Sequence, residues 1–445
     1  MSRRDDLLRQ YADHSLFMAN RIERNIAENR KGIAHIRVLD AENQPVPDAV
    51  LKLRQRTHDF NFGCSIFLLD EMESTAKNEA YKAYFQKLFN LAVAPFYWDA
   101  LEPVQGQPRF AKDSPKVYRR PAPDLVLDFC EPKGIRVKGH CLVYHGFTPD
   151  WVPKAIPEAK RLLARRMQEI AARYADRIGD WDVENESLCS YPFDRMPFYN
   201  EPDYLDWSFI QADRYFSPAN RLFINEASDF CWAKGKQFKG PQSAYYQQIQ
   251  GLLERGRRVD CIGMQYHQFV RKERELADSL PYDPETLYEV LDCYSRFNRP
   301  IQISEITIPS YESGPEEEAL QAELVRNLYR IWFSHRSVDA INWWNLADGY
   351  TFVNPRNPSW NENYYAGGLV RHDLTAKPAY QVLDDLINRE WRTQETLAVD
   401  ADGRASFEGF YSEYDVEIIR DGRTSPAALH LAKGLPRQFE LQVQA

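Results

Sequence analysis

Two glutamates are the residues of this chain best placed to do chemistry. Glu186 ends the apolar run at 180–187, and Glu305 ends the β-branched run that begins at residue 300. Such a run indicates a strand, and a charged residue at its tip has left the core. Either glutamate alone could be an ion-pair partner or a helix cap. As a pair, they could cleave a glycosidic bond, one protonating the leaving oxygen and the other attacking the sugar.

The elements that must position this pair are short apolar runs separated by longer amphipathic segments. Eight such runs lie at 60–67, 88–96, 135–144, 180–187, 221–228, 259–267, 300–308 and 340–348. Strand–helix alternation predicts an α/β fold with a parallel sheet, and eight repeats predict a (β/α)8 TIM barrel. A doubly wound open sheet usually has fewer strands, and no Gly-x-Gly-x-x-Gly loop follows the first run. In a barrel, Glu186 and Glu305 would meet at the carboxyl ends of strands four and seven.

The two ends of the chain have a different pattern. Residues 5–30 read as a helix, and 33–39 and 49–55 alternate around a turn-rich loop, which predicts a β-hairpin. Residues 396–445 alternate again, with Asp402-Gly403 and Asp421-Gly422 as turns. We therefore expect an N-terminal unit at 1–57, a barrel at 58–392 and a C-terminal β unit at 393–445. One or both terminal segments form a small accessory β unit.

Composition restricts the partners. The net charge of the 445 residues is −9, and the basic residues are scattered, which argues against nucleic acid or an anionic membrane surface. No apolar run approaches the ~18 residues of a membrane span. The 10 Trp, 25 Tyr and 24 Phe suit the flat faces of sugar rings, although a large core uses aromatic residues equally well. Oligomeric state is not indicated.

Cysteine usage and the N-terminus bear on the compartment. The seven cysteines are dispersed and none forms a Cys-x-x-Cys, which predicts reduced, mostly buried thiols and a reducing compartment. The first residues lack the apolar core of a signal peptide. We expect a cytoplasmic protein, or a secreted one if a native signal has been removed.

Several motifs resemble a known family. Residues 181–186, Trp-Asp-Val-Glu-Asn-Glu, and 303–306, Ile-Ser-Glu-Ile, resemble the acid/base and nucleophile motifs of glycoside hydrolase family 10, the endo-β-1,4-xylanases. Segments at 98–106, 139–151, 262–267 and 344–380 resemble further parts of that family in the same order. The resemblance implies a retaining β-glycoside hydrolase that forms a covalent glycosyl-enzyme on a β-linked, xylan-like or decorated oligosaccharide or glycoside. It implies neither a metal nor another cofactor.

The resemblance also implies roles for single residues. Glu186 would be the acid/base with a raised pKa, and Glu305 the ionised nucleophile. Asn185 would bind the 2-hydroxyl of the sugar, and His267 would hold Glu305 with Gln265 beside it. His140 would touch the same sugar, which would stack on Trp344. Four further residues are expected to bind substrate: Tyr97, Trp98, Tyr144 and His145.

The chain departs from the family where the glycone, the sugar portion that the enzyme retains, should be held. The family carries Glu-Asn-x-x-Lys before its Trp-Asp-Ala, and this chain has Val93, Ala94 and Tyr97 at the three polar positions. Each lost charged hydrogen bond should weaken xylan binding by ~1–3 kcal/mol. We predict that plain xylan is not the substrate or enters differently, against an apolar wall of Pro95, Phe96 and Tyr97. Three other positions also differ: Tyr144 and Phe352 replace tryptophans, with Trp360 near the latter, and Glu184 replaces an aliphatic residue.

Other readings stay open. A non-catalytic sugar-binding relative would need neither glutamate, and a transglycosylase would use the same covalent intermediate. A metal-dependent hydrolase would use His140, His145 and His267, but the first strand has no His-x-His, and His140 and His145 are expected to face different ways. Glu226 is either a third carboxylate of the site or a supporting residue. Glu102 is expected to fix its own loop.

Overall fold

The computed structural model describes residues 3–189, 196–232, 238–354 and 357–443, and its central feature is a closed barrel of eight parallel strands. Neighbouring strands pair in chain order, and the last pairs with the first. The predicted (β/α)8 barrel is therefore confirmed. Its strands are β3 (Asn61–Ser65), β4 (Leu91–Pro95), β5 (Arg136–His140), β6 (Asp180–Asn185), β7 (Arg221–Glu226), β8 (Cys261–His267), β9 (Ile301–Thr307) and β10 (Val338–Trp343).

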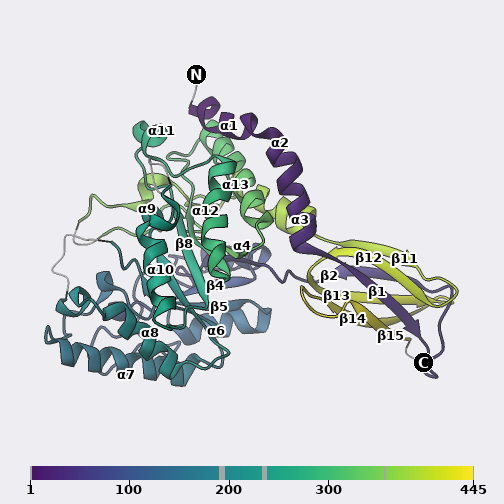
Figure 1. The fold of residues 1–445 in the computed structure, drawn as a ribbon, viewed down its shortest axis with the longest axis horizontal. Coiled ribbons are helices and arrows are strands. Elements are labelled where there is room, and N and C mark those ends of the chain that lie inside the picture. The colour runs from purple at the N-terminus through teal and green to yellow at the C-terminus, as the bar shows by residue number, and fades with distance from the viewer. Residues whose placement is uncertain (1–2, 190–195, 233–237, 355–356, 444–445) are drawn as a thin grey trace.

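Helices surround this barrel (Figure 1). Four of them, α6, α12, α13 and α14, begin with a proline, whose fixed φ suits a first helical turn and whose missing N–H is not needed there. Each helix buries one apolar stripe against the strands, as in α7, where Leu162, Met167 and Ile170 face inward. The helices are α4 (Thr75–Leu88), α5 (Trp98–Leu101), α6 (Pro123–Cys130), α7 (Ile156–Tyr174), α8 (Tyr204–Tyr215), α9 (Ser228–Trp232), α10 (Ala244–Glu254), α11 (Glu275–Asp278), α12 (Pro284–Tyr294), α13 (Pro315–Ser334) and α14 (Pro378–Asp385).

The N-terminal helix expected at 5–30 is present as three α-helical pieces joined by a π-helical turn. These are α1 (Arg3–Asp13), α2 (Ser15–Phe17) and α3 (Glu23–Arg30), with the π-helical turn at Met18–Ile22. Leu7, Ile22 and Ile26 are buried, and the pieces pack along α13 of the barrel. This helix leads the chain from the barrel to the accessory β unit (Figure 1).

The accessory unit is a sandwich of two sheets, to which both ends of the chain contribute. One sheet has the order β12 (Arg404–Phe410), β1 (Lys31–Leu39), β15 (Gln438–Gln442); the other has β11 (Gln394–Ala398), β2 (Val50–Gln55), β13 (Ser412–Arg420), β14 (Arg423–Leu431). The inward residues of both sheets, such as Ile36, Leu51 and Val416, form one apolar core. Asp421 and Gly422 both have positive φ and join β13 to β14 as the predicted tight turn.

The predicted N-terminal hairpin is wrong. Its two strands, β1 and β2, do not pair with each other but lie in opposite sheets. β1 pairs with β12 and β15, and β2 with β11 and β13. The alternation predicted two strands with one buried face each, and it did not say which edges would pair, because the C-terminal strands compete for the same edges.

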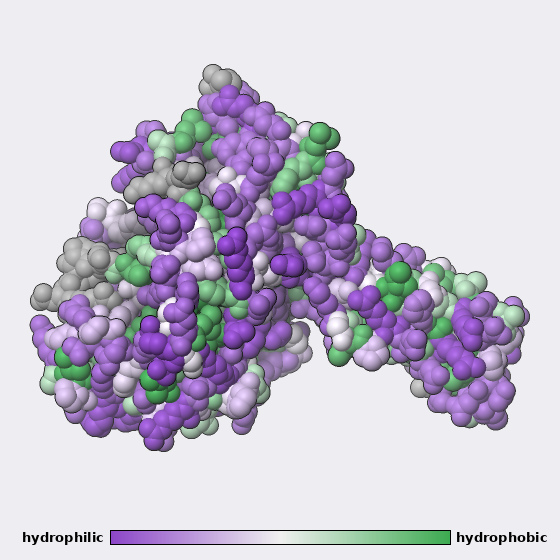
Figure 2. Space-filling view, viewed as in Figure 1, coloured by the Kyte–Doolittle hydropathy of each residue, from purple (hydrophilic) through white to green (hydrophobic). Residues whose placement is uncertain are grey.

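The visible surface is largely hydrophilic over both the barrel and the sandwich, with apolar residues scattered among polar ones (Figure 2). In the part of the chain that the structure describes, no helix is both long enough and apolar enough to cross a membrane.

Candidate active site

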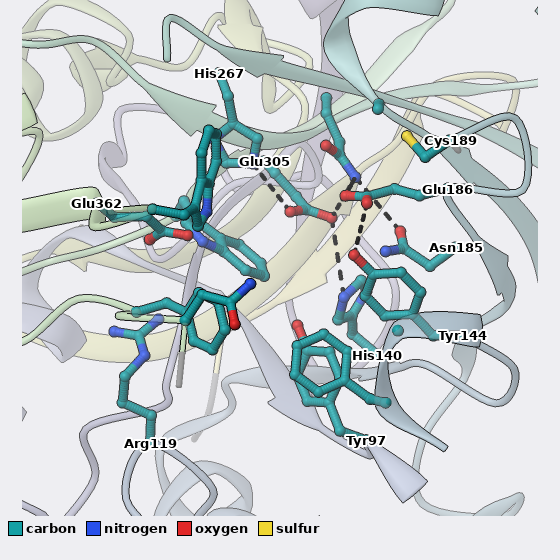
Figure 3. Close-up of a pocket in the computed structure, with 18 of the residues that line it drawn as sticks. Tyr97, Arg119, His140, Tyr144, Asn185, Glu186, Cys189, His267, Glu305 and Glu362 are labelled. Atoms are coloured by element: carbon teal, nitrogen blue, oxygen red, sulfur yellow. Dashed lines mark hydrogen bonds and ion pairs between the residues drawn. The ribbon is translucent and has the colours of Figure 1, made fainter. Parts of the chain in front are cut away.

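A cavity of about 840 Å³ opens at the carboxyl ends of the barrel strands. Glu305 lies on β9, and Glu186 directly follows β6; both line this cavity and point toward each other (Figure 3). Glu186 is 9% exposed and Glu305 is 4% exposed, so both side chains are largely removed from bulk water. The barrel thus brings together the two residues that the sequence singled out.

One amide nitrogen bridges the two carboxyl groups. Gln265 Nε2 donates to Glu186 Oε1 at 3.0 Å and to Glu305 Oε1 at 3.2 Å. Because both oxygens lie so close to the same nitrogen, they are at most about 6 Å apart. This spacing is close to the ~5–5.5 Å of retaining glycosidases and below the ~6.5–9.5 Å that leaves room for a water in inverting ones.

Glu305 receives further polar contacts from three directions. Asn225 Nδ2 lies 2.8 Å from Oε1, His267 Nε2 lies 3.1 Å from Oε2, and His140 Nε2 lies 3.9 Å from Oε1. Burial nevertheless raises the pKa of Glu305 to about 8, although His140 and the Asn225 hydrogen bond oppose the rise. We expected an ionised Glu305 from the sequence, whereas its buried position favours the protonated form below that pH.

His140 is fixed from behind by a buried ion pair. Its Nδ1 lies 2.8 Å from Asp182 Oδ2, and the other Asp182 oxygen lies 2.8 Å from Lys138 Nζ. Burial alone would raise the pKa of Asp182, but Lys138 and His140 outweigh it and lower that pKa. The ionised Asp182 therefore orients the imidazole so that Nε2 faces Glu305 and the cavity.

His267 takes part as a neutral ring. Burial lowers the pKa of His267 to about 4. Its Nδ1 lies 2.9 Å from the Thr307 hydroxyl and its Nε2 faces Glu305. With Glu305 ionised, Nε2–H donates to the carboxylate and Nδ1 accepts from Thr307. The ring thus holds Glu305 as the family resemblance implied.

Glu186 is positioned by its backbone and by a tyrosine. Its φ of 56° lies in the left-handed region, and its N–H donates to the carbonyl of Asn225 at 3.0 Å. The Tyr144 hydroxyl donates to Glu186 Oε2 at 2.6 Å. Glu226 lies below this turn and accepts from the backbone N–H of Leu188 at 2.9 Å, and burial raises its pKa to about 8. Glu226 is fully buried and supports the turn.

Seven of the nine predicted substrate-binding residues line the cavity: Tyr97, His140, Tyr144, Asn185, Gln265, His267 and Trp344. The structure places the other two elsewhere. Trp98 is buried in α5, where Nε1 donates to Glu102 at 3.0 Å, and Glu102 also accepts from the N–H of Gly106, so it fixes its loop as predicted. His145 stacks edge-on against Tyr144 and Tyr199 outside the cavity lining.

The predicted apolar wall is only partly correct. Tyr97 lines the cavity, but Phe96 is fully buried and packs against Trp181, because successive residues of an extended segment face opposite ways. Loops distant in sequence supply the remaining aromatic lining, with Phe67 and Phe147 near Tyr97, and Phe352 beside Phe147. Trp360 lies at the rim against Phe269 and is 41% exposed.

Several functional candidates were missed from the sequence. Asn225, the penultimate residue of β7, donates to both Asn185 Oδ1 and Glu305, and accepts from the Ser304 hydroxyl. Gly263 makes room for it, since a Cβ there would lie 2.3 Å from Asn225 Oδ1. A polar residue inside an apolar run was the available signal for Asn225, as it was for Lys138 and Asp182.

The three histidines proposed for a metal do not converge, because His145 lies outside the cavity lining. Over the described ranges, no group of three or more His, Cys, Asp or Glu residues has an arrangement that could hold a metal ion.

Comparison with known proteins identifies the family of the chain. Residues 54–386 match the sequence profile of glycosyl hydrolase family 10. The chain belongs to this family. The matched region contains the whole barrel and every cavity residue described above. It also contains Val93, Ala94 and Tyr97, which stand where the resemblance predicts three polar residues.

The relatives of this family 10 protein are distant. It is 26% identical over 409 residues to the anti-sigma-I factor RsgI6 of Acetivibrio thermocellus, covering 89% of this chain and 46% of that protein. It is 25% identical to a β-1,4-xylanase of Dictyoglomus thermophilum, covering 64% of this chain and 85% of the relative. The chain spans about half the length of the first relatives that it matches.

Solved structures share the fold. Xylanase 10B from Thermotoga petrophila, in complex with xylobiose, superposes with a TM-score of 0.59 at 21% identity, over 75% of this chain and 95% of that one. Xylanase 10B from Thermotoga maritima gives a TM-score of 0.57 at 22% identity, over 75% and 96%.

Proposed function

We propose that this protein hydrolyses β-glycosidic bonds with retention of configuration, through a covalent glycosyl-enzyme. The observation that carries the proposal is the single Gln265 amide that bonds both carboxyl groups. The resulting spacing fits direct attack by one carboxylate and leaves too little room for an intervening water. Family membership supports the same chemistry.

In the first step, Glu305 attacks the anomeric carbon as a carboxylate while Glu186 gives its proton to the leaving oxygen. The hydrogen bonds from Asn225, Gln265 and His267 orient Glu305 for attack. Departure of the leaving group breaks the glycosidic bond and leaves the sugar esterified to Glu305.

In the second step, water attacks the anomeric carbon and Glu186, now a carboxylate, removes its proton. The bond to Glu305 breaks, and the sugar leaves with its original configuration. The Tyr144 hydroxyl bonds Glu186 directly, so it can hold this carboxyl group in one orientation through both steps. A sugar hydroxyl in place of water would give transglycosylation by the same route.

We propose a β-linked, xylan-like or decorated oligosaccharide or glycoside as the substrate. Several relatives are named as xylanases, which supports a β-1,4-linked pentose backbone. Val93 and Ala94 are buried strand residues, and Tyr97 is an aromatic wall residue, so the polar contacts to the glycone that the family uses are absent. The glycone is therefore expected to differ from an unsubstituted xylan chain.

Binding without turnover is the competing function, and similarity to a protein named an anti-sigma factor favours it. The test is incubation of the full chain with aryl β-xylosides and xylo-oligosaccharides, with the anomer of the first product read by NMR. Glu305→Gln should abolish turnover but keep binding, whereas Glu254→Gln, on the exposed face of α10, should change neither. Binding by the wild type without product would establish the competing function, and an inverted product would overturn the retaining mechanism.

A further inference from the structure

We propose that Arg119 and Arg120 form a subsite for an anionic substituent on the glycone, most simply the carboxylate of a uronic acid. This inference rests on the proposed function, because it names the kind of sugar that the same cavity accepts. Both residues line the cavity and are buried: Arg119 is 3% exposed and Arg120 is 9% exposed.

The two guanidinium groups keep most of their donors unused. Arg119 Nη1 donates to the carbonyl of Tyr350 at 2.6 Å, and its buried Nε has no hydrogen-bond partner among the described residues. Arg120 Nη1 donates to the carbonyl of Arg119 at 2.9 Å. Within the described part of the chain, neither arginine has a carboxylate oxygen within 4.0 Å. Buried charges are normally paired, so this pair is suited to receive an anion.

Two other buried arginines show the difference. Arg109 donates to three backbone carbonyls, those of Ala100, Pro115 and Arg120, and lines no part of the cavity. Arg166 likewise donates to three backbone carbonyls, those of Phe96, Cys141 and Leu142, just beyond the ends of β4 and β5. Each of these side chains is a structural brace that uses several of its five N–H groups. Arg119 and Arg120 each use one such contact and face the cavity.

The pair lies on the glycone side of the site. Arg120 stacks on Tyr97 at 3.9 Å from the ring centroid, and Tyr97 meets His140, which faces Glu305. Figure 3 shows Arg119 across the cavity from Glu186. Because Glu186 serves the leaving oxygen, the side away from it holds the retained sugar. Tyr97 replaces the family's lysine there, and the positive charge now comes from a different loop.

Two acidic residues share this part of the cavity and need to be considered. Asp99 and Glu362 line it, and Glu362 Oε2 accepts from Asn345 at 2.9 Å. Burial lowers the pKa of Arg120, and both carboxyl groups oppose this shift at a distance. They do not use the N–H groups of the two arginines, so those donors stay available to a ligand.

The guanidinium geometry favours a carboxylate. Its planar fork matches the two oxygens of a carboxylate, and the rings of Tyr97 and Phe67 hold the Arg120 guanidinium at the cavity wall. Arg119 also has a φ of 61°, an uncommon backbone conformation for a non-glycine residue. A sulfate ester would offer related oxygens in a tetrahedral arrangement and is tested as a separate arm.

The experiment measures ligand binding to the 445-residue chain carrying Glu305→Gln by calorimetry, so that the result does not depend on turnover. The probes are xylotriose, xylotriose carrying a glucuronic acid on its non-reducing sugar, and xylotriose sulfated at that sugar. We expect the uronic acid probe to bind at least ~10-fold more tightly than xylotriose, with a preference that weakens as salt is added. Adding Arg119→Met or Arg120→Met should reduce that ratio to near one, and Arg161→Met, an exposed arginine on α7, should leave it unchanged.

The outcomes separate this inference from the proposed function. Equal affinity for xylotriose and its uronic acid derivative would overturn the anion subsite even if the wild type hydrolyses both. A higher affinity for the sulfated probe than for the uronic acid probe would support the anion subsite but assign it to a sulfate ester. If the uronic acid probe binds more tightly than xylotriose but the wild type hydrolyses neither, only the proposed function is overturned. If the methionine variants do not fold, Arg119→Lys and Arg120→Lys keep the charge but lose the fork, and their ratio should fall by at least ~3-fold.

Discussion

The two sides of the cavity differ in how far their polar groups are bonded to the protein. On the catalytic side, Glu186, Glu305, Asn225 and Gln265 bond one another within a few ångströms, and each carboxyl oxygen of Glu305 has a donor nearby. On the side proposed to hold the glycone, aromatic rings surround two guanidinium groups, each of which donates one hydrogen bond to a described residue. The proposed reaction constrains the residues around Glu186 and Glu305, because attack and protonation need defined atomic positions. The residues around Arg119 and Arg120 only have to match a substrate, so other residue types can take their place.

The largest expected effect comes from removing the proton donor on the catalytic side. Glu186→Gln should lower kcat for unactivated oligosaccharides by ~10²–10⁴-fold, because general acid catalysis contributes about that much. With a 2,4-dinitrophenyl glycoside, whose leaving group needs no proton, the first step should be nearly unaffected. The measurement is kcat/KM for the two substrates, which reports the first step alone, with the exposed Glu254→Gln as the control. An equal loss of kcat/KM on both substrates would remove the acid role from Glu186.

Asn225→Ala should give the next largest effect. Asn225 orients Glu305 and Asn185 together, so its loss should lower kcat/KM by ~10–100-fold, the value of one or two charge-assisted hydrogen bonds. Steady-state kinetics and thermal unfolding should be measured side by side. Asn220→Ala is the matched control, because this buried asparagine braces the opposite end of β7 through the carbonyls of Ala175 and Ile178. A similar loss of activity in both would mean that Asn225 acts only through stability.

The pH profile tests how burial tunes the catalytic side. Glu305 works as a carboxylate and its pKa is raised to about 8, so activity should fall as the pH drops through that value. The acid limb of kcat/KM should therefore lie above pH 4.5. His140 lowers the pKa of Glu305, so His140→Gln should move the limb to higher pH, by about one pH unit. His335→Gln, at a buried histidine paired with Asp292 far from the cavity, should not move it. A limb at or below pH 4.5 in the wild type would contradict the expected burial effect.

The smallest effects come from two tyrosines that face the same cavity from the two sides. Tyr144→Phe removes the hydroxyl that bonds Glu186 and should lower kcat for unactivated substrates by ~5–10-fold, the value of one hydrogen bond. Tyr97→Phe should change kcat by less than ~2-fold, because its hydroxyl has no hydrogen-bond partner in the described residues and its ring remains under Arg120. The measurement is kcat of both variants and the wild type on the same unactivated substrate. A larger loss for Tyr97→Phe would show that its hydroxyl binds the sugar.

Local pattern was sufficient to predict the barrel and to single out Glu186 and Glu305, which the structure brings together. β6 and β9 are apolar runs that end in a polar residue, and such runs can be recognised one strand at a time. Pairing in the sandwich could not be read in this way, because β1 and β2 alternate equally well in a hairpin or in opposite sheets. Trp98 and His145 fell into family motifs, but α5 and the 3₁₀ turn at His145–Phe147 direct their side chains elsewhere.

By itself, the sequence determined which residues can do the chemistry. Glu305 lies near the end of β9 and Glu186 directly follows β6, and the geometry of a barrel brings the carboxyl ends of its strands together whatever the loops do. Only the tertiary structure decided what surrounds them. The Gln265 bridge, the burial that raises the pKa of Glu305 and the Arg119–Arg120 pair each depend on loops and strands far apart in sequence. Distances, desolvation and unpaired charge are properties of a three-dimensional neighbourhood, and no local run of residues encodes them.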